Sequence, residues 1–183
     1  WLRPSAVPAD QADTAPMLLQ LSDSEAFSQV LLEKVLATDS ASDYTVRAFI
    51  DGLEPGKHYY YRFLGGNGTV SRTGRTMTAR PLDDSRPVNV AFASCQSYEQ
   101  GYYGSWARMI ADDREADPGD RLDFILHLGD FIYERSWLKR LDGSDQSRYV
   151  PDFPDGERNE QNRHAVSLAD YRHLYKPYLS DPH

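Results

Sequence analysis

The chain has little of three features that would each direct it to a particular class of protein. Its 183 residues include one cysteine, Cys95, so an internal disulfide cannot form. No apolar run approaches membrane-spanning length, and the mean hydropathy of −0.64 fits a soluble protein. Basic residues are outnumbered by acidic ones, and the net charge of −8 argues against a nucleic-acid-binding surface, which is normally basic.

The first half of the chain has the pattern of an all-β domain. Short apolar and aromatic runs predict strands at residues 17–21, 27–36, 44–50, 59–64 and 69–79. Residues 65–68, Gly-Gly-Asn-Gly, predict a hairpin turn because they accept positive φ at low cost. Tyr59 closes a phrase that resembles the corner of fibronectin type III and immunoglobulin-like sandwiches, where the tyrosine hydroxyl binds upstream backbone. We therefore predict a fibronectin type III-like β-sandwich over residues 1–82, with its N-terminal strand missing.

A polar segment bounded by Pro81 and Pro87 separates this half from the second, because a proline cannot donate a hydrogen bond to a sheet. After it, residues 88–95 and 124–128 are short apolar runs that predict buried strands. Apolar residues between the two runs recur at helical spacing, so we expect a helix to connect the strands. A strand, a helix and a strand in this order place the two strands parallel and adjacent.

Three side chains near the ends of these runs are candidate ligands of a single cation. Cys95 ends the first run, Asp130 follows the second after a glycine, and Tyr133 completes the phrase Gly-Asp-x-x-Tyr. Ligands of parallel sheets gather outside the carboxyl ends of the strands, so Cys95 and Asp130 are expected to share one crevice. Carboxylate and phenolate oxygens suit a hard cation such as Fe(III), and a thiolate argues for a transition metal over calcium alone.

Each of these residues also has an ordinary structural interpretation. A lone cysteine is usually a small hydrophobe, an aspartate after glycine is usually a turn residue, and a tyrosine can simply pack. Taken separately, each ordinary interpretation is the stronger one. A metal site is favoured only when the spacing of the three residues is combined with the family resemblance described next. His127 lies in mid-strand among apolar neighbours, and we interpret it as a packed core histidine without a ligand role.

Several phrases of the second half resemble, in the right order, the alkaline phosphatase D (PhoD) family of metallophosphoesterases. They are FASCQ at residues 92–96, GYY at 101–103, HLGDFIYE at 127–134 and DYRHLYKPYLSDP at 170–182. The resemblance implies that Cys95, Asp130 and Tyr133 bind Fe(III), that Ca(II) ions complete the centre, and that the aspartate bridges two cations. It also implies the first part of an α/β calcineurin-like metallophosphoesterase domain over residues 87–183, and a periplasmic or extracellular location.

The chemistry that this resemblance implies is hydrolysis of phosphate mono- or diesters, in which a metal-activated hydroxide attacks phosphorus. Clustered cations would neutralise the ester and lower the pKa of a bound water. They would also allow a chain of net charge −8 to accept an anionic substrate. No side chain is assigned as catalytic or substrate-binding. Because the remaining metal ligands would lie beyond residue 183, we expect this chain by itself to be inactive.

Two other functions stay open at this point. A purple acid phosphatase-like enzyme also combines a sandwich with Gly-Asp-x-x-Tyr, but its first strand usually ends in an aspartate where this chain has Cys95. A non-catalytic β-sandwich interaction module would leave the three candidate ligands without metal. The sequence indicates neither the ester that is cleaved nor an oligomeric state.

The end of the chain contains a polar stretch and a helix. Residues 136–166 show no regular period, which predicts a cover loop whose arginines are solvated. The pattern from Ser167 to Asp170 is typical of a capping box that starts a helix. Three tyrosines then recur on one helical face, which is expected to face the core: Tyr171, Tyr175 and Tyr178. Pro177 is expected to kink or end this helix.

Overall fold

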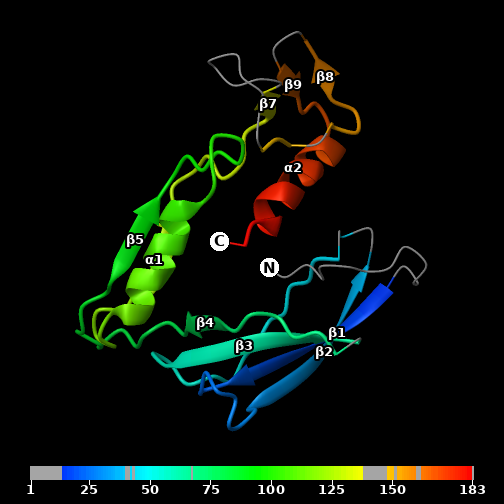
Figure 1. The fold of residues 1–183 in the computed structure, drawn as a ribbon. Coiled ribbons are helices and arrows are strands. Elements are labelled where there is room, and N and C mark those ends of the chain that lie inside the picture. Colours follow the sequence, from blue (N-terminus) through cyan, green and yellow to red (C-terminus); the bar gives the residue numbers. More distant parts are fainter. Residues whose placement is uncertain are drawn as a thin grey trace. The chain divides into compact units, whose positions relative to one another are not determined.

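The computed structural model describes residues 14–39, 42, 44–66, 68–137, 148–150, 152–159 and 162–182, and the chain divides into two compact units (Figure 1). The first unit is Trp1–Pro87 and the second is Val88–His183. The division falls at the second proline of the polar segment. No helix in the described part of the chain has the length and apolar character needed to cross a membrane.

The first unit contains a four-stranded antiparallel sheet in the order β2-β1-β3-β4 (Figure 1). Its strands are β1 (Thr14–Ser22), β2 (Leu32–Asp39), β3 (His58–Gly65) and β4 (Gly74–Met77). The apolar residues of the central strand β1 alternate and are buried on one face: Met17, Leu19 and Leu21. On its other face Gln20 and Ser22 are buried as well. Among the described residues of this unit the strands form one sheet, so the second layer of the predicted sandwich is not seen there.

The turn and the corner tyrosine of this unit are confirmed. The Tyr59 side chain is buried, and its hydroxyl accepts a hydrogen bond from the backbone N–H of Glu54 at 3.0 Å. The chain reverses after β3, where the N–H of Gly65 bonds to the carbonyl of Thr69 at 2.9 Å and Gly68 has a φ of 79°. That positive φ explains the glycine, and Asn67 lies outside the described residues.

The strand predicted at residues 44–50 is wrong. Tyr44 has a φ of 56°, residues 45–50 have no regular secondary structure, and the Phe49 side chain is 81% exposed. β-rich composition forms a strand only where a neighbouring strand can pair with it, and no described strand pairs with this segment. Two other strands are shorter than predicted, because β2 begins at Leu32 and β4 covers only Gly74–Met77.

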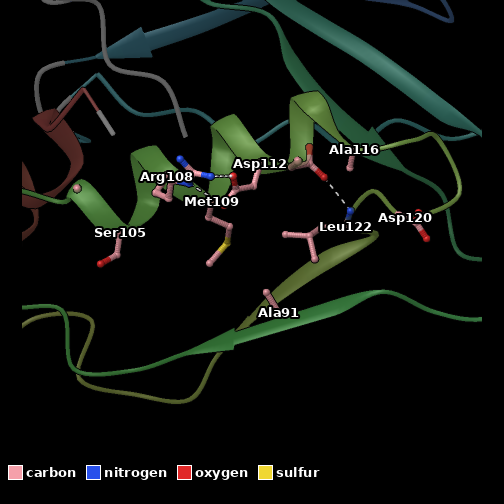
Figure 2. Close-up of a pocket in the computed structure, with 10 residues that line it drawn as sticks. Ala91, Ser105, Arg108, Met109, Asp112, Ala116, Asp120 and Leu122 are labelled. Carbon is pink, nitrogen blue, oxygen red and sulfur yellow. Dashed lines mark hydrogen bonds and ion pairs between the residues drawn. The ribbon is translucent and has the colours of Figure 1, made fainter.

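The second unit begins with the predicted strand, helix and strand. Strand β5 (Val90–Ala93) pairs in parallel with β6 (Phe124–His127), and helix α1 (Gly104–Glu115) connects them. The strands are not buried, however, since the Phe92 side chain is 73% exposed. Ala91 lies on the face of this two-stranded sheet toward α1 (Figure 2). The opposite face has large apolar residues that remain exposed: Val90, Phe92, Phe124 and Leu126.

The polar stretch at residues 136–166 is more ordered than predicted. It contributes most of a three-stranded antiparallel sheet in the order β7-β9-β8. The strands are β7 (Arg135–Trp137), β8 (Glu157–Arg158) and β9 (Asn162–His164). Two of its arginines, Arg148 and Arg163, are buried, so the expectation that they are solvated is wrong. Residues 138–147 of the predicted loop lie outside the described residues.

Helix α2 (Leu168–Ser180) begins at the predicted capping box, in which Ser167 and Asp170 bond to each other's backbone N–H. Its buried side chains are Asp170, Leu174 and Tyr178, whereas Tyr171 and Tyr175 are exposed. The predicted tyrosine face is therefore correct only at Tyr178. Pro177 does not end the helix, which continues to Ser180. Leu174 and Tyr178 form the core of this unit with Tyr103, Val150 and Ala165.

Asp170 should make the stability of the second unit depend on pH. Burial alone would raise the pKa of this carboxyl, but the N–H groups of Asp155, Val166 and Ser167 donate to it at 2.9, 2.9 and 3.1 Å and lower that pKa. Its contribution is therefore complete above the unfolded-state pKa of about 4 and is lost as the pH falls through the lower folded-state pKa.

We expect Asp170→Asn to lower the midpoint of urea unfolding at pH 7, and the difference from the unchanged chain to shrink as the pH drops below about 4. Asp117→Asn, which changes an exposed carboxylate in the same unit, is the control. A difference that stays constant from pH 7 to pH 3 would contradict this assignment.

Candidate functional site

The candidate site lies in the two loops that follow β5 and β6, where backbone hydrogen bonds continue the parallel pairing of the strands. The N–H of Leu128 donates to the carbonyl of Ala93 at 2.8 Å, and the N–H of Cys95 donates to the carbonyl of Gly129 at 3.2 Å. The N–H of the next residue, Gln96, bonds to the carbonyl of Asp130 at 3.1 Å. The two loops are thus joined residue by residue up to the candidate ligands.

All three candidate ligands meet at one carboxylate oxygen. The Cys95 thiol donates to Oδ2 of Asp130 at 3.3 Å, and the Tyr133 hydroxyl lies 3.5 Å from the same oxygen. The second distance is long for a hydrogen bond, so it records proximity more than binding strength. Cys95 and Asp130 are exposed and Tyr133 is half-buried, which leaves the group accessible from solvent. The structure thus brings together the three residues that the sequence singled out.

The backbone at this site has an uncommon conformation. Cys95 and Asp130 have φ values of 60° and 54°, in the left-handed region that residues other than glycine rarely adopt. Gly129, with a φ of 128°, makes the turn into Asp130. Such conformations persist where surrounding contacts hold them, and they are frequent at functional sites. The hydrogen bonds between the two loops are the contacts that hold them here.

The Tyr133 phenol is kept protonated by its surroundings. Loss of hydration on packing, followed by the neighbouring Cys95 and Asp130 side chains, raises its pKa to about 12. A cation among these groups would reverse that effect, because positive charge favours the thiolate and the phenolate.

The donor set therefore fits a hard transition-metal cation. Its thiol and its phenol both lie close to one carboxylate oxygen, so all three donors could contact a single cation. In the described part of the chain, no group of three or more histidine, cysteine, aspartate and glutamate side chains forms a metal site. The candidate site has only two side chains of these four types, Cys95 and Asp130, because its third donor is the phenol of Tyr133.

Two pockets lie along α1. The smaller, about 310 Å³, is next to the candidate ligands and is lined by Cys95 together with Ser94, Gln96, Tyr102, Tyr103 and Trp106, among others. The larger, about 740 Å³, lies between α1 and β5 (Figure 2). It has apolar Ala91 and Met109 and the exposed ion pair of Arg108 and Asp112, whose charged atoms are 2.6 Å apart. It contains none of the three candidate ligands.

Sequence reasoning missed the residues that support the site. Gln96, in the loop after β5, bonds to the β6 loop and to Trp106, although it lies within the phrase FASCQ that pointed to Cys95. The buried Glu99 carboxylate accepts from the Ser136 hydroxyl at 2.7 Å and from the N–H of Val150 at 3.1 Å. It joins the loop after Cys95 to β7, which begins soon after Tyr133. No signal in the sequence indicated this pairing, because the partners are far apart along the chain.

Both units of the chain are similar to known proteins. Residues 90–183 match the family model described as PhoD-like phosphatase, and residues 1–80 match that of the PhoD-like phosphatase N-terminal domain. Alkaline phosphatase D of Bacillus subtilis (strain 168) is 31% identical over 167 residues, which cover 91% of this chain and 25% of that protein. A solved structure described as "Structure of PhoD" is 29% identical, with a TM-score of 0.73, over 94% of this chain and 30% of its own. The chain thus spans about a quarter of the length of the curated relative.

Proposed function

Because the chain belongs to the PhoD-like phosphatase family, we propose that it supplies part of the centre of a metal-dependent phosphate-ester hydrolase. The residues proposed to bind Fe(III) are Cys95, Asp130 and Tyr133, and Asp130 is the one that could bridge to Ca(II). The observation that carries the proposal is the convergence of a thiol and a phenol on one oxygen of Asp130, at 3.3 and 3.5 Å. When bound, the cations would activate water and neutralise the phosphate ester.

The residues of the chain have defined parts in this proposal. Cys95 and Tyr133 would bind the cation as thiolate and phenolate, and Asp130 holds the two donors near one carboxylate oxygen. Gly129 allows the backbone to turn so that the carboxylate faces the loop of β5. Cys95 at the end of β5 favours a PhoD-like centre over a purple acid phosphatase-like one, whose first strand usually ends in aspartate.

The finer assignments of fold and location are part of the same proposal. We assign residues 1–82 to a fibronectin type III-like sandwich and residues 87–183 to part of a calcineurin-like α/β metallophosphoesterase domain. The structural similarity to PhoD and the two family matches support this division. We also propose that the protein acts outside the cytoplasm, which is the location that the family resemblance of its motifs implies.

Substitution of Tyr133 by phenylalanine tests the metal centre. A tyrosinate bound to Fe(III) gives a charge-transfer absorption in the visible, so the iron-loaded protein should be coloured and Tyr133→Phe should lose the colour. We also expect the iron affinity of Tyr133→Phe to fall by at least about tenfold. Loss of a residue that only supports a ligand already costs that much, and Tyr133 is proposed to be a ligand itself. Titration with Fe(III) followed by visible absorption and by metal analysis measures both.

Tyr149→Phe, which changes an exposed tyrosine outside the group of three donors, is the matched control and should keep the band. A protein that takes up no iron would overturn the proposed function. A Tyr133→Phe protein with an undiminished band would overturn the role of the phenol.

A further inference from the structure

We infer that Gln96 is a positioning residue that holds the two ligand-bearing loops in register, and that Trp106 of α1 orients its side-chain amide. This inference rests on the proposed function, because the geometry it explains is that of the proposed iron ligands. Gln96 follows Cys95 directly in the chain. It does not contact the shared carboxylate oxygen, so it acts through the residues that do.

Gln96 makes three hydrogen bonds that together span the site. Its backbone N–H donates to the carbonyl of Asp130 at 3.1 Å, and its side-chain Nε2 donates to the carbonyl of Phe131 at 3.2 Å. Its Oε1 accepts from the indole N–H of Trp106 at 3.0 Å. A single residue therefore binds two successive carbonyls of the β6 loop and connects that loop to α1.

The identity of these partners explains why an amide is needed. The indole N–H of Trp106 can only donate, so the oxygen of Gln96 must face it and the NH₂ group must face Phe131. A glutamate could accept from Trp106 but would have no hydrogen for the Phe131 carbonyl. The tryptophan is itself held in place, since its ring stacks on His127 with centroids 6.3 Å apart.

The same bonds account for the unusual backbone of the ligands. Cys95 and Asp130 both occupy the left-handed region, which the surrounding contacts must hold. Gln96 is linked to both residues in this conformation. It follows Cys95 in the chain, and it bonds to the carbonyls of Asp130 and Phe131. Without its side chain we expect the loops to relax and the 3.3 Å contact between Sγ and Oδ2 to open.

Gln96→Leu tests the inference, with Gln100→Leu as the matched control. Gln100→Leu is the same substitution in the same loop, but Gln100 is exposed. We expect Gln96→Leu to lower Fe(III) affinity by roughly 10- to 100-fold, as loss of an outer-shell partner typically does, with the melting profile by circular dichroism retained. Gln100→Leu should bind iron as the unchanged chain does. Equal affinities in the two variants would overturn the inference.

The metal-free protein gives a readout that does not depend on iron. Cys95 is the only cysteine in the chain, so alkylation by iodoacetamide reports on one atom. We expect Gln96→Leu to react faster because the thiol leaves its contact with Asp130, and Gln100→Leu to react at the original rate. If the unchanged chain takes up no iron, the proposed function fails, and the alkylation rates still decide the inference.

Trp106→Phe covers the case in which Gln96→Leu does not fold. It keeps an aromatic ring in the sequence position beside His127, although a smaller one, and removes the N–H that orients the amide. We expect it to weaken iron binding and to speed alkylation in the same direction as Gln96→Leu. Unchanged values for both measurements in a folded Trp106→Phe protein would overturn the inference.

Discussion

Replacing Asp130 with asparagine is expected to abolish iron binding. Asp130 supplies the oxygen that both Cys95 and Tyr133 contact, and a neutral amide is a poor ligand for a hard cation. Outer-shell changes cost roughly 10- to 100-fold in affinity, so loss of a charged ligand should cost more than about 100-fold. Asparagine also tolerates the left-handed backbone at this position, so the fold should survive the change.

Titration with Fe(III), followed by visible absorption and by metal analysis, measures this effect. Asp120→Asn is the control, because Asp120 is an exposed carboxylate of the same unit that lies apart from the three donors. It should leave iron affinity unchanged. An Asp130→Asn protein that binds iron as tightly as the unchanged chain would show that the carboxylate is not a ligand.

The second large effect is expected from Arg148→Leu, which should lower the free energy of unfolding of the second unit by about 3–5 kcal/mol. The side chains of Arg148 and Asp181 form an ion pair and are only 7% and 4% exposed. The guanidinium also lies 3.7 Å from the ring centroid of Tyr98 and donates to the carbonyl of Gly101 at 3.3 Å. The substitution leaves the buried carboxylate of Asp181 without its guanidinium partner, which is the costly part of the change.

Arg108→Leu provides the comparison, since it makes the same substitution in an exposed ion pair. Arg108 pairs with Asp112 four residues away on α1, and both side chains are open to solvent. Such pairs contribute about 0.3–0.5 kcal/mol, so the loss should be close to that value. Urea unfolding curves of the two variants give the difference directly. If the two variants lost the same free energy of unfolding, the buried position of the Arg148 pair would not make its removal more costly.

The sequence was sufficient for the parts of the fold that depend on local pattern. The period of α1 between two apolar runs predicted the parallel pairing of β5 and β6, and the strand-end argument then predicted that Cys95 and Asp130 would meet. The start of α2 was predictable because a capping box is specified by residues three positions apart. The corner tyrosine, Tyr59, followed in the same way from a short phrase.

The parts that could not be predicted depend on contacts between distant residues. Arg148 and Arg163 lie in a polar segment without period, and they are buried because Tyr98, Glu99 and Ser136 surround them from elsewhere in the chain. The segment at residues 44–50 has β-rich composition, but none of the described strands pairs with it, which composition cannot reveal. The support of the site by Gln96 was missed because a glutamine has no fixed role until its partners are known.

All three donor atoms belong to the unit Val88–His183, and so does every hydrogen bond that holds them. Substitutions or tags confined to the β-rich unit therefore leave every residue of these hydrogen bonds unaltered, so they can be introduced without changing a donor atom.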